Sequence, residues 1–275
     1  MIESILRPSS VEKRPWEAFI AGFLFTIVAI LLTLQLGVEG AGAGLLLVAF
    51  ISIPAAPFFL NLFRLEEKHH GGNIFSRHKK LIEIFGFFFL AVILASSLVY
   101  VILPPETSAQ LYDDQANSLR AMGVIKAEAS AASEIGFGYI LINNLQVLFL
   151  AFIFSFVFGA GAVWLIAWNA TILGVLIGKI AENPVAFGSI LVVKDNIATN
   201  YVLALPLTLI RLLPHGILEF GGYFFGAIAG GILSVTLIQE RYKEHKALPV
   251  MKDSLIYLAI AGALILIGAV VEVAL

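Results

Sequence analysis

Long apolar runs that contain no charged side chain recur along the chain. They cover Ala18–Val38, Gly40–Phe63, Ile84–Pro105, Ile135–Gly178, Ile197–Ile210, Phe220–Gln239 and Leu255–Val271. Most are close to the roughly 20 residues that a helix needs to cross about 30 Å of hydrocarbon. The runs are continuously apolar rather than alternating, so they predict helices and exclude a membrane β-barrel. The expected fold class is all-α, a polytopic transmembrane helix bundle.

Two of these runs depart from the length of a single span. Ile135–Gly178 is long enough for two helices, and a turn near Gly159 and Gly161 would divide it into Tyr139–Phe158 and Ala162–Ala181. Ile197–Ile210 is too short to cross comfortably. Because it contains Pro206 and is followed by Pro214, residues 197–213 are expected to form a re-entrant or broken helix. The pattern therefore predicts about seven spans plus one short re-entrant or broken helix.

The positively charged residues predict the orientation in a cell membrane. Lys and Arg concentrate before residue 18 and in the linkers 64–83 and 240–252, whereas the other connections contain few. Basic segments stay on the cytoplasmic side. The N-terminus is thus expected inside and, after seven crossings, the C-terminus outside.

Three sections follow from this topology. Residues 1–83 form two N-terminal membrane helices and a basic cytoplasmic linker, 84–239 form a membrane core with a small extracytoplasmic loop at 104–137, and 240–275 form a basic linker and the final membrane helix. Within the loop, Ser108–Met122 followed by Gly123 is typical of a short polar helix with a glycine stop. The loop is too small for a catalytic domain.

Composition agrees with a membrane location. Hydrophobic residues make up 60% of the chain and charged residues 13%, whereas soluble domains carry about 25% charged residues. The expected partner is the lipid bilayer. A net charge of −2 offers no electrostatic footprint for nucleic acid. The chain has no cysteine, so disulfides and thiolate chemistry are excluded and zinc would need His and carboxylate ligands.

Polar residues inside the apolar C-terminal half are the candidates for a functional site, because a polar group in lipid costs free energy and normally needs a partner. They form an intramembrane cluster of Asn143, Asn144, Asn169, Asn200, Arg211, His215 and Glu219. The last three are spaced four apart and would share one face of an uninterrupted helix. Pro214 and Gly216 favour a break or a hairpin tip instead.

This cluster has three interpretations. His215 and Glu219 could be metal ligands or a proton relay; Arg211 and Glu219 could form a compensating pair, with His215 capping a helix end; or the polar residues could line a transport pathway. The paired His-Glu-x-x-His pattern of zinc proteases is absent. No catalytic residue, metal ligand or cofactor is assigned.

Clustered imidazoles in the 66–80 linker, from His69, His70 and His78, are a second candidate for transition-metal binding. The alternative is a solvated loop that faces the lipid headgroups.

Glycines at four-residue spacing predict faces where helices pack closely. Gly222, Gly226 and Gly230 form one such face, and Gly174 with Gly178 forms another. Small residues let helix backbones approach each other. The partner is either another helix of the same chain or a second copy in a homo-oligomer.

The order of these features resembles the stage II sporulation protein M family of integral membrane proteins. The resemblance rests on Asn143–Val147, Phe158–Gly161, Trp168–Ala170, Leu173–Gly178 and, most specifically, Leu213–Glu219 followed by the glycine-spaced helix. It covers about residues 135–237 and leaves 1–83 and the span after 240 as additions. It implies a membrane anchor, since the family's namesake in spore-forming bacteria holds cell-wall-degrading partners in a complex that drives membrane migration during engulfment.

The leading functional hypothesis is a non-enzymatic scaffold that assembles with itself or with other membrane or envelope proteins through glycine-lined helix faces. The alternative is a channel or secondary transporter with a pathway near the broken helix at 197–219. A third hypothesis is an intramembrane metal-dependent hydrolase that uses His215 and Glu219.

Overall fold

The computed structural model describes residues 11, 14–66, 74–122, 137–158, 161–184, 196–238 and 247–274. The helices in these ranges are α3 (Glu17–Gln35), α4 (Ala43–Glu66), α5 (Ile74–Ile102), α6 (Pro105–Leu111), α7 (Asp113–Ala121), α8 (Phe137–Phe158), α9 (Ala162–Glu182), α10 (Ile197–Ile238) and α11 (Ala247–Ala274). No strand occurs in these ranges, so the all-α prediction is confirmed.

Seven helical segments of the described chain are long and apolar enough to cross a membrane. They are Glu17–Gln35, Ala43–Arg64, Lys79–Ile102, Phe137–Phe158, Ala162–Glu182, Pro214–Thr236 and Val250–Ala274. The long central run is divided where the glycines predicted, with α8 ending at Phe158 and α9 beginning at Ala162. The number of spans expected from the sequence is therefore confirmed.

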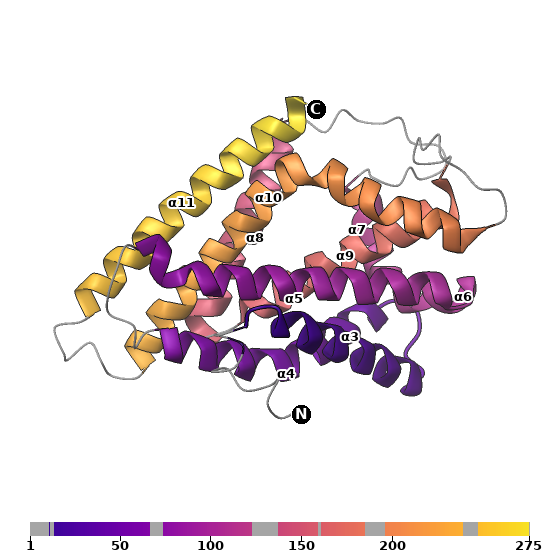
Figure 1. The fold of residues 1–275 in the computed structure, drawn as a ribbon, viewed down its shortest axis with the longest axis horizontal. Helices are drawn as coiled ribbons and strands as arrows, with labels where there is room; N and C mark the ends of the chain where they lie inside the picture. Colours follow the sequence, from indigo (N-terminus) through magenta and orange to yellow (C-terminus); the bar gives the residue numbers. More distant parts are fainter. Residues whose placement is uncertain are drawn as a thin grey trace.

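The short apolar segment Ile197–Arg211 is not a separate helix but the first part of α10. The helix continues through Pro214 and Gly216, so the predicted hairpin tip at this point is wrong. With 42 residues, α10 is about 60 Å long, twice the thickness of the hydrocarbon core. It bends in its middle part (Figure 1), because Pro206 and Pro214 each remove a backbone hydrogen bond inside the helix.

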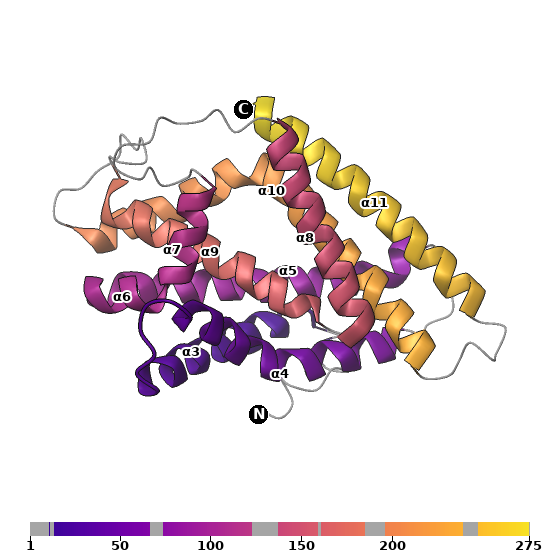
Figure 2. The ribbon, with the colours of Figure 1, turned by 180° about the vertical axis from the view of Figure 1, so that it is seen from behind.

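The helices fall into two groups that α10 joins. α3, α4 and α5 lie along the long axis of the molecule, whereas α8 and α11 cross it obliquely, and the end of α11 lies beside the start of α8 (Figures 1 and 2). In the first group α5 packs against both α3 and α9. In the second, α10 packs most extensively against α11 and α8, and it also contacts α4, α5 and α9.

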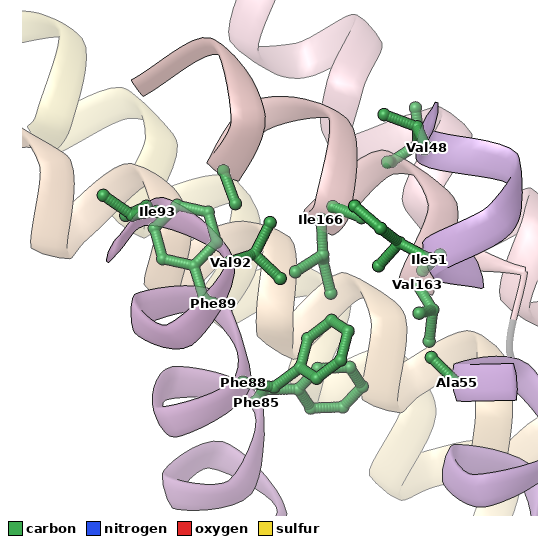
Figure 3. Packing of buried hydrophobic residues seen from close by; sticks show 14 of the residues in the cluster. Val48, Ile51, Ala55, Phe85, Phe88, Phe89, Val92, Ile93, Val163 and Ile166 are labelled. Carbon is green, nitrogen blue, oxygen red and sulfur yellow. The ribbon is translucent and has the colours of Figure 1, made fainter. Parts of the chain in front are cut away.

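Aromatic rings fill the contact between α4, α5 and α10. The ring of Phe85 stacks on Phe59 at a centroid distance of 4.4 Å and on Phe224 at 5.7 Å. Figure 3 shows the labelled α5 side chains on one side and those of α4 on the other, with Val163 and Ile166 of α9 between them. Association in lipid gains little from the hydrophobic effect, so dispersion between such closely packed groups holds the helices together.

The predicted glycine faces are used for packing within the chain. A Cβ at Gly174 would lie 2.7 Å from Cβ of Ser96 on α5, and one at Gly222 would lie 2.9 Å from Ile265 on α11. Gly178 lies against the ring of Tyr100 on α5, and Gly226 against Leu148 on α8. Gly230 lies against backbone atoms of Phe152 and Phe156 on α8. These glycines are therefore covered by other helices of the same molecule and are not available to a second copy.

The connection between α5 and α8 contains two short helices, α6 and α7, where the sequence predicted one. They meet at Tyr112, which is fully buried and donates a hydrogen bond to the carbonyl of Ser96 at 3.3 Å. The Asp114 carboxylate accepts bonds from the backbone N–H groups of Gly42 and Leu45, at 3.0 and 3.2 Å, and so caps the start of α4. The segment is thus anchored on the bundle.

Replacing Gly230 with Ala should destabilise the protein. The added Cβ would clash with the carbonyl oxygen of Phe152, so α8 and α10 must separate, at a cost of about 1–3 kcal/mol. The melting temperature in detergent should fall by several degrees. Gly262→Ala on α11 is the matched control, because a Cβ there meets nothing within 4 Å. Equal melting temperatures for the two variants would contradict the tight α8–α10 contact.

Removing the Asp114 carboxylate should also lower stability, because the first turn of α4 loses its cap. Asp114→Ala should cost about 1–2 kcal/mol, which thermal melting in detergent would detect. Asp113→Ala serves as the control, since among the described residues the Asp113 carboxylate is bonded only locally, by Asn117 at 3.1 Å. If both substitutions lower the melting temperature equally, the cap contributes nothing specific.

Candidate intramembrane polar site

A cavity of about 210 Å³ lies between α7, α8, α9, α10 and α11, and we call it the polar cavity. Its polar lining residues are Tyr139, Asn143, Asn144, Asn169, His215, Glu219, Tyr223 and Glu272. Leu119 and Met122 of the α7 segment line it as well. Four of the five lining helices contain membrane spans, and the cavity lies near the ends of three of them, where the spans of α8 and α10 begin and that of α11 ends.

Asn144 is the centre of a hydrogen-bond network that joins α8 to α10. Its amide nitrogen donates to Oε1 of Glu219 at 2.8 Å, and its amide oxygen accepts from the Tyr223 hydroxyl at 2.6 Å. All three residues are buried. Glu219 and Tyr223 are four residues apart on α10, so one amide can contact both.

Glu272 brings a second carboxyl group to Glu219. Both side chains line the polar cavity, and the two carboxyl groups are close enough to interact electrostatically. Gly268, one turn before Glu272, makes the approach possible, because a Cβ there would lie 2.8 Å from Cγ of Glu219. Two carboxylates this close repel each other in a medium of low dielectric constant, and a shared proton or a bound cation relieves the repulsion.

His215 and Asn169 complete the lining from α10 and α9. The Nδ1 atom of His215 is buried and has no hydrogen-bond partner in the described part of the chain. Asn169 donates back to the carbonyl of Leu165 at 2.8 Å. The Asn143 amide donates to Oδ1 of Asn144 at 3.5 Å, so it supports the central network only weakly.

Of the seven residues in the predicted polar cluster, Asn200 and Arg211 do not line the cavity. Arg211 is exposed, and among the described side chains no salt bridge joins it to Glu219. The compensating pair was therefore wrong. Arg211 and Glu219 are eight residues apart, and each residue turns a helix by about 100°. Their side chains therefore point about 80° apart around the helix axis, and Pro214 lies between them. Asn200 is buried near the start of α10, away from the other members.

In the described ranges, no three His, Asp or Glu side chains come close enough together to bind a metal ion. His69 and His70 lie outside those ranges, as does the side chain of His78. The metal interpretation of the 66–80 linker therefore stays a prediction.

Three polar residues of the lining, Tyr139, Tyr223 and Glu272, were missed in the sequence. Tyr223 follows Glu219 by four residues, a spacing that places both on one helix face. Glu272 directly follows the last apolar run, where it looks like the polar end of a span. The sequence does not show that the end of α11 packs beside the start of α8, because this contact depends on the three-dimensional packing.

The helices and the polar cavity define the class of the chain, a multi-pass α-helical integral membrane protein with an internal polar site. It belongs to the stage II sporulation protein M family, whose family model matches residues 84–275. The match begins at α5 and includes α11, so the final span is part of the family region rather than an addition to it. No curated protein and no solved structure matches the chain.

A double-mutant cycle should measure the contact between Asn144 and Tyr223. Tyr223→Phe removes one buried hydrogen bond and should lower the free energy of unfolding by about 1 kcal/mol. The same substitution in an Asn144→Ala background should cost much less, because its acceptor is already absent. Unfolding by a denaturing detergent gives both values. Tyr139→Phe, at an exposed hydroxyl on the cavity rim, is the control, and additive effects of the two main substitutions would contradict the network.

Proposed function

We propose that this protein is a channel or secondary transporter, without enzymatic activity, whose binding site for a small cationic group is the polar cavity. The observation that carries the proposal is the meeting of Glu219 and Glu272, which come from different membrane helices and lie side by side in that cavity. Glu219 lies near the start of the span Pro214–Thr236 and Glu272 near the end of Val250–Ala274, and acidic residues within membrane spans commonly mark ion and substrate pathways. A helix bundle that is held together by packing alone does not need two neighbouring carboxyl groups.

The charges around the cavity favour a cation. Among the residues that the structure describes, its lining contains two carboxyl groups and one imidazole but no Lys or Arg. The remaining polar groups are amides and hydroxyls, whose oxygen atoms accept hydrogen bonds from an ammonium group. An anion in the same place would meet like charge without compensation.

The shape of α10 supports transport as well. In many transporters the substrate site lies beside an irregular point of a membrane helix. α10 contains two prolines and bends in its middle part, and Glu219 and Tyr223 follow Pro214 on the same helix (Figure 1). The pathway expected near residues 197–219 thus shifts toward the C-terminal half of α10.

A membrane anchor is the second candidate, in keeping with the role of the family's namesake. The supporting observation is that α8 and α11 are the least buried of the seven spans. They expose large apolar side chains such as Phe149 and Leu255, which lipid, a second copy or another membrane or envelope protein can cover. The glycine faces give no further support to this candidate, because they are covered within the chain.

Cation flux into liposomes tests the transport proposal. The protein is reconstituted and currents are recorded on solid-supported membranes after jumps in Na⁺, K⁺ or methylammonium concentration. Wild type should give a current with at least one of these ions. Glu219→Gln and Glu272→Gln should each reduce it about tenfold, which corresponds to about 1.4 kcal/mol of lost binding.

Glu39→Gln is the matched control, because Glu39 is exposed in the connection between α3 and α4 and lines no part of the cavity. It should conduct as wild type does. No current with any of the three ions, or equal currents in wild type and both cavity variants, would contradict transport and leave the anchor as the better candidate.

A further inference from the structure

A second, larger space lies next to the polar cavity. It has a volume of about 610 Å³, is formed by α5, α9, α10 and α11, and we call it the apolar groove. Its lining is almost wholly hydrocarbon, with Phe89, Ile93, Leu209 and Phe224 among its residues. Since its walls belong mostly to membrane spans, the solvent around it is lipid rather than water.

The groove and the polar cavity adjoin each other. Leu173, Gly216 and Phe220 line both spaces. These residues come from α9 and α10, so the two spaces meet where these helices face each other, and Gly216 adds no side chain there. A molecule that occupies both therefore has an apolar part on one side of this junction and a polar part on the other.

We infer that the ligand of the site is a cationic amphiphile, with its alkyl chain in the apolar groove and its amine head in the polar cavity against Glu219 and Glu272. This inference rests on the proposed function and names the chemical class of the substrate. We infer an amine because the described part of the cavity lining has two carboxyl groups and neither Lys nor Arg. The chain follows from the lining of the adjoining groove.

The volumes fit such a molecule. The groove falls in the range of about 300–1,000 Å³ in which proteins hold small organic ligands. The polar cavity is smaller, and its 210 Å³ corresponds to the liquid volume of about seven water molecules. The polar cavity accommodates a compact amine head but no long alkyl chain. When the head occupies the cavity, the alkyl chain therefore lies in the groove.

Glycines on the groove wall allow it to be filled without disturbing the helices. Gly86 lines the groove, and a Cβ there meets nothing within 4 Å. Gly86→Leu therefore extends its side chain into free space. Gly221→Leu is a second plug from α10, where the nearest atom to an added Cβ is Cδ1 of Leu264 at 3.6 Å. Gly262→Leu is the control, since Gly262 has free space but lines neither the groove nor the cavity.

Native mass spectrometry of the detergent-purified protein tests the inference, with dodecylamine, dodecanoate and butylamine as probes at equal concentration. Wild type should bind one dodecylamine at least tenfold more tightly than either of the others. Gly86→Leu and Gly221→Leu should each weaken dodecylamine binding about tenfold or more, because excluding only two methylene groups from the groove has that effect. Glu272→Gln should weaken it as well, whereas Gly262→Leu should not. Melting temperatures close to that of wild type show that the variants are folded.

The outcomes separate this inference from the proposed function. If butylamine binds as tightly as dodecylamine and the plugs have no effect, the amphiphile is wrong while a cation site in the cavity stands. If dodecanoate binds as tightly as dodecylamine and Glu272→Gln has no effect, the groove binds chains without using the carboxyl pair, and the inference is overturned. Binding of none of the probes overturns it too, and the flux experiment then decides the proposed function independently.

Discussion

Glu219 depends on partners from other helices, because its carboxyl group lies inside a bundle that crosses lipid. Asn144 on α8 donates to it, and Glu272 on α11 lies against it. Both contacts require α8, α10 and α11 to come unusually close, which Gly226 and Gly268 allow. The polar network and the glycine packing are thus two parts of one arrangement, and changing either one disturbs the other.

The packing of the glycine faces within the chain also changes which functional hypothesis is favoured. Four-residue glycine spacing suggested an assembly interface, but Gly222 and Gly230 are covered by α11 and α8. The side chains that remain exposed on α8 and α11 are large and apolar, and lipid tails can cover them as well as protein can. The cavity with its carboxyl pair is more specific, since a buried acid in a membrane helix needs a reason beyond packing.

The helices followed from the sequence because their signal is local. A charge-free run of sufficient length has to be a helix in lipid, and Gly159 to Gly161 marked the one turn hidden inside a longer run. The site was predicted from the sequence only in part. Asn144, His215 and Glu219 stood out as polar residues in apolar runs, whereas Glu272 looked like an ordinary end of a span. Its role depends on where α11 packs, and one sequence contains no information on that pairing.

The anchoring of α7 has a consequence for the kinetics of the site. Leu119 and Met122 cover the cavity at that end, and the segment is attached to α4 through Asp114 and to α4 and α9 through Gln115. If a ligand binds in the cavity, as proposed, leaving past α7 would break these polar contacts, whereas leaving sideways through the groove would break none of them. Loosening the cap on α4 would then shorten the residence time for only the first of these two routes.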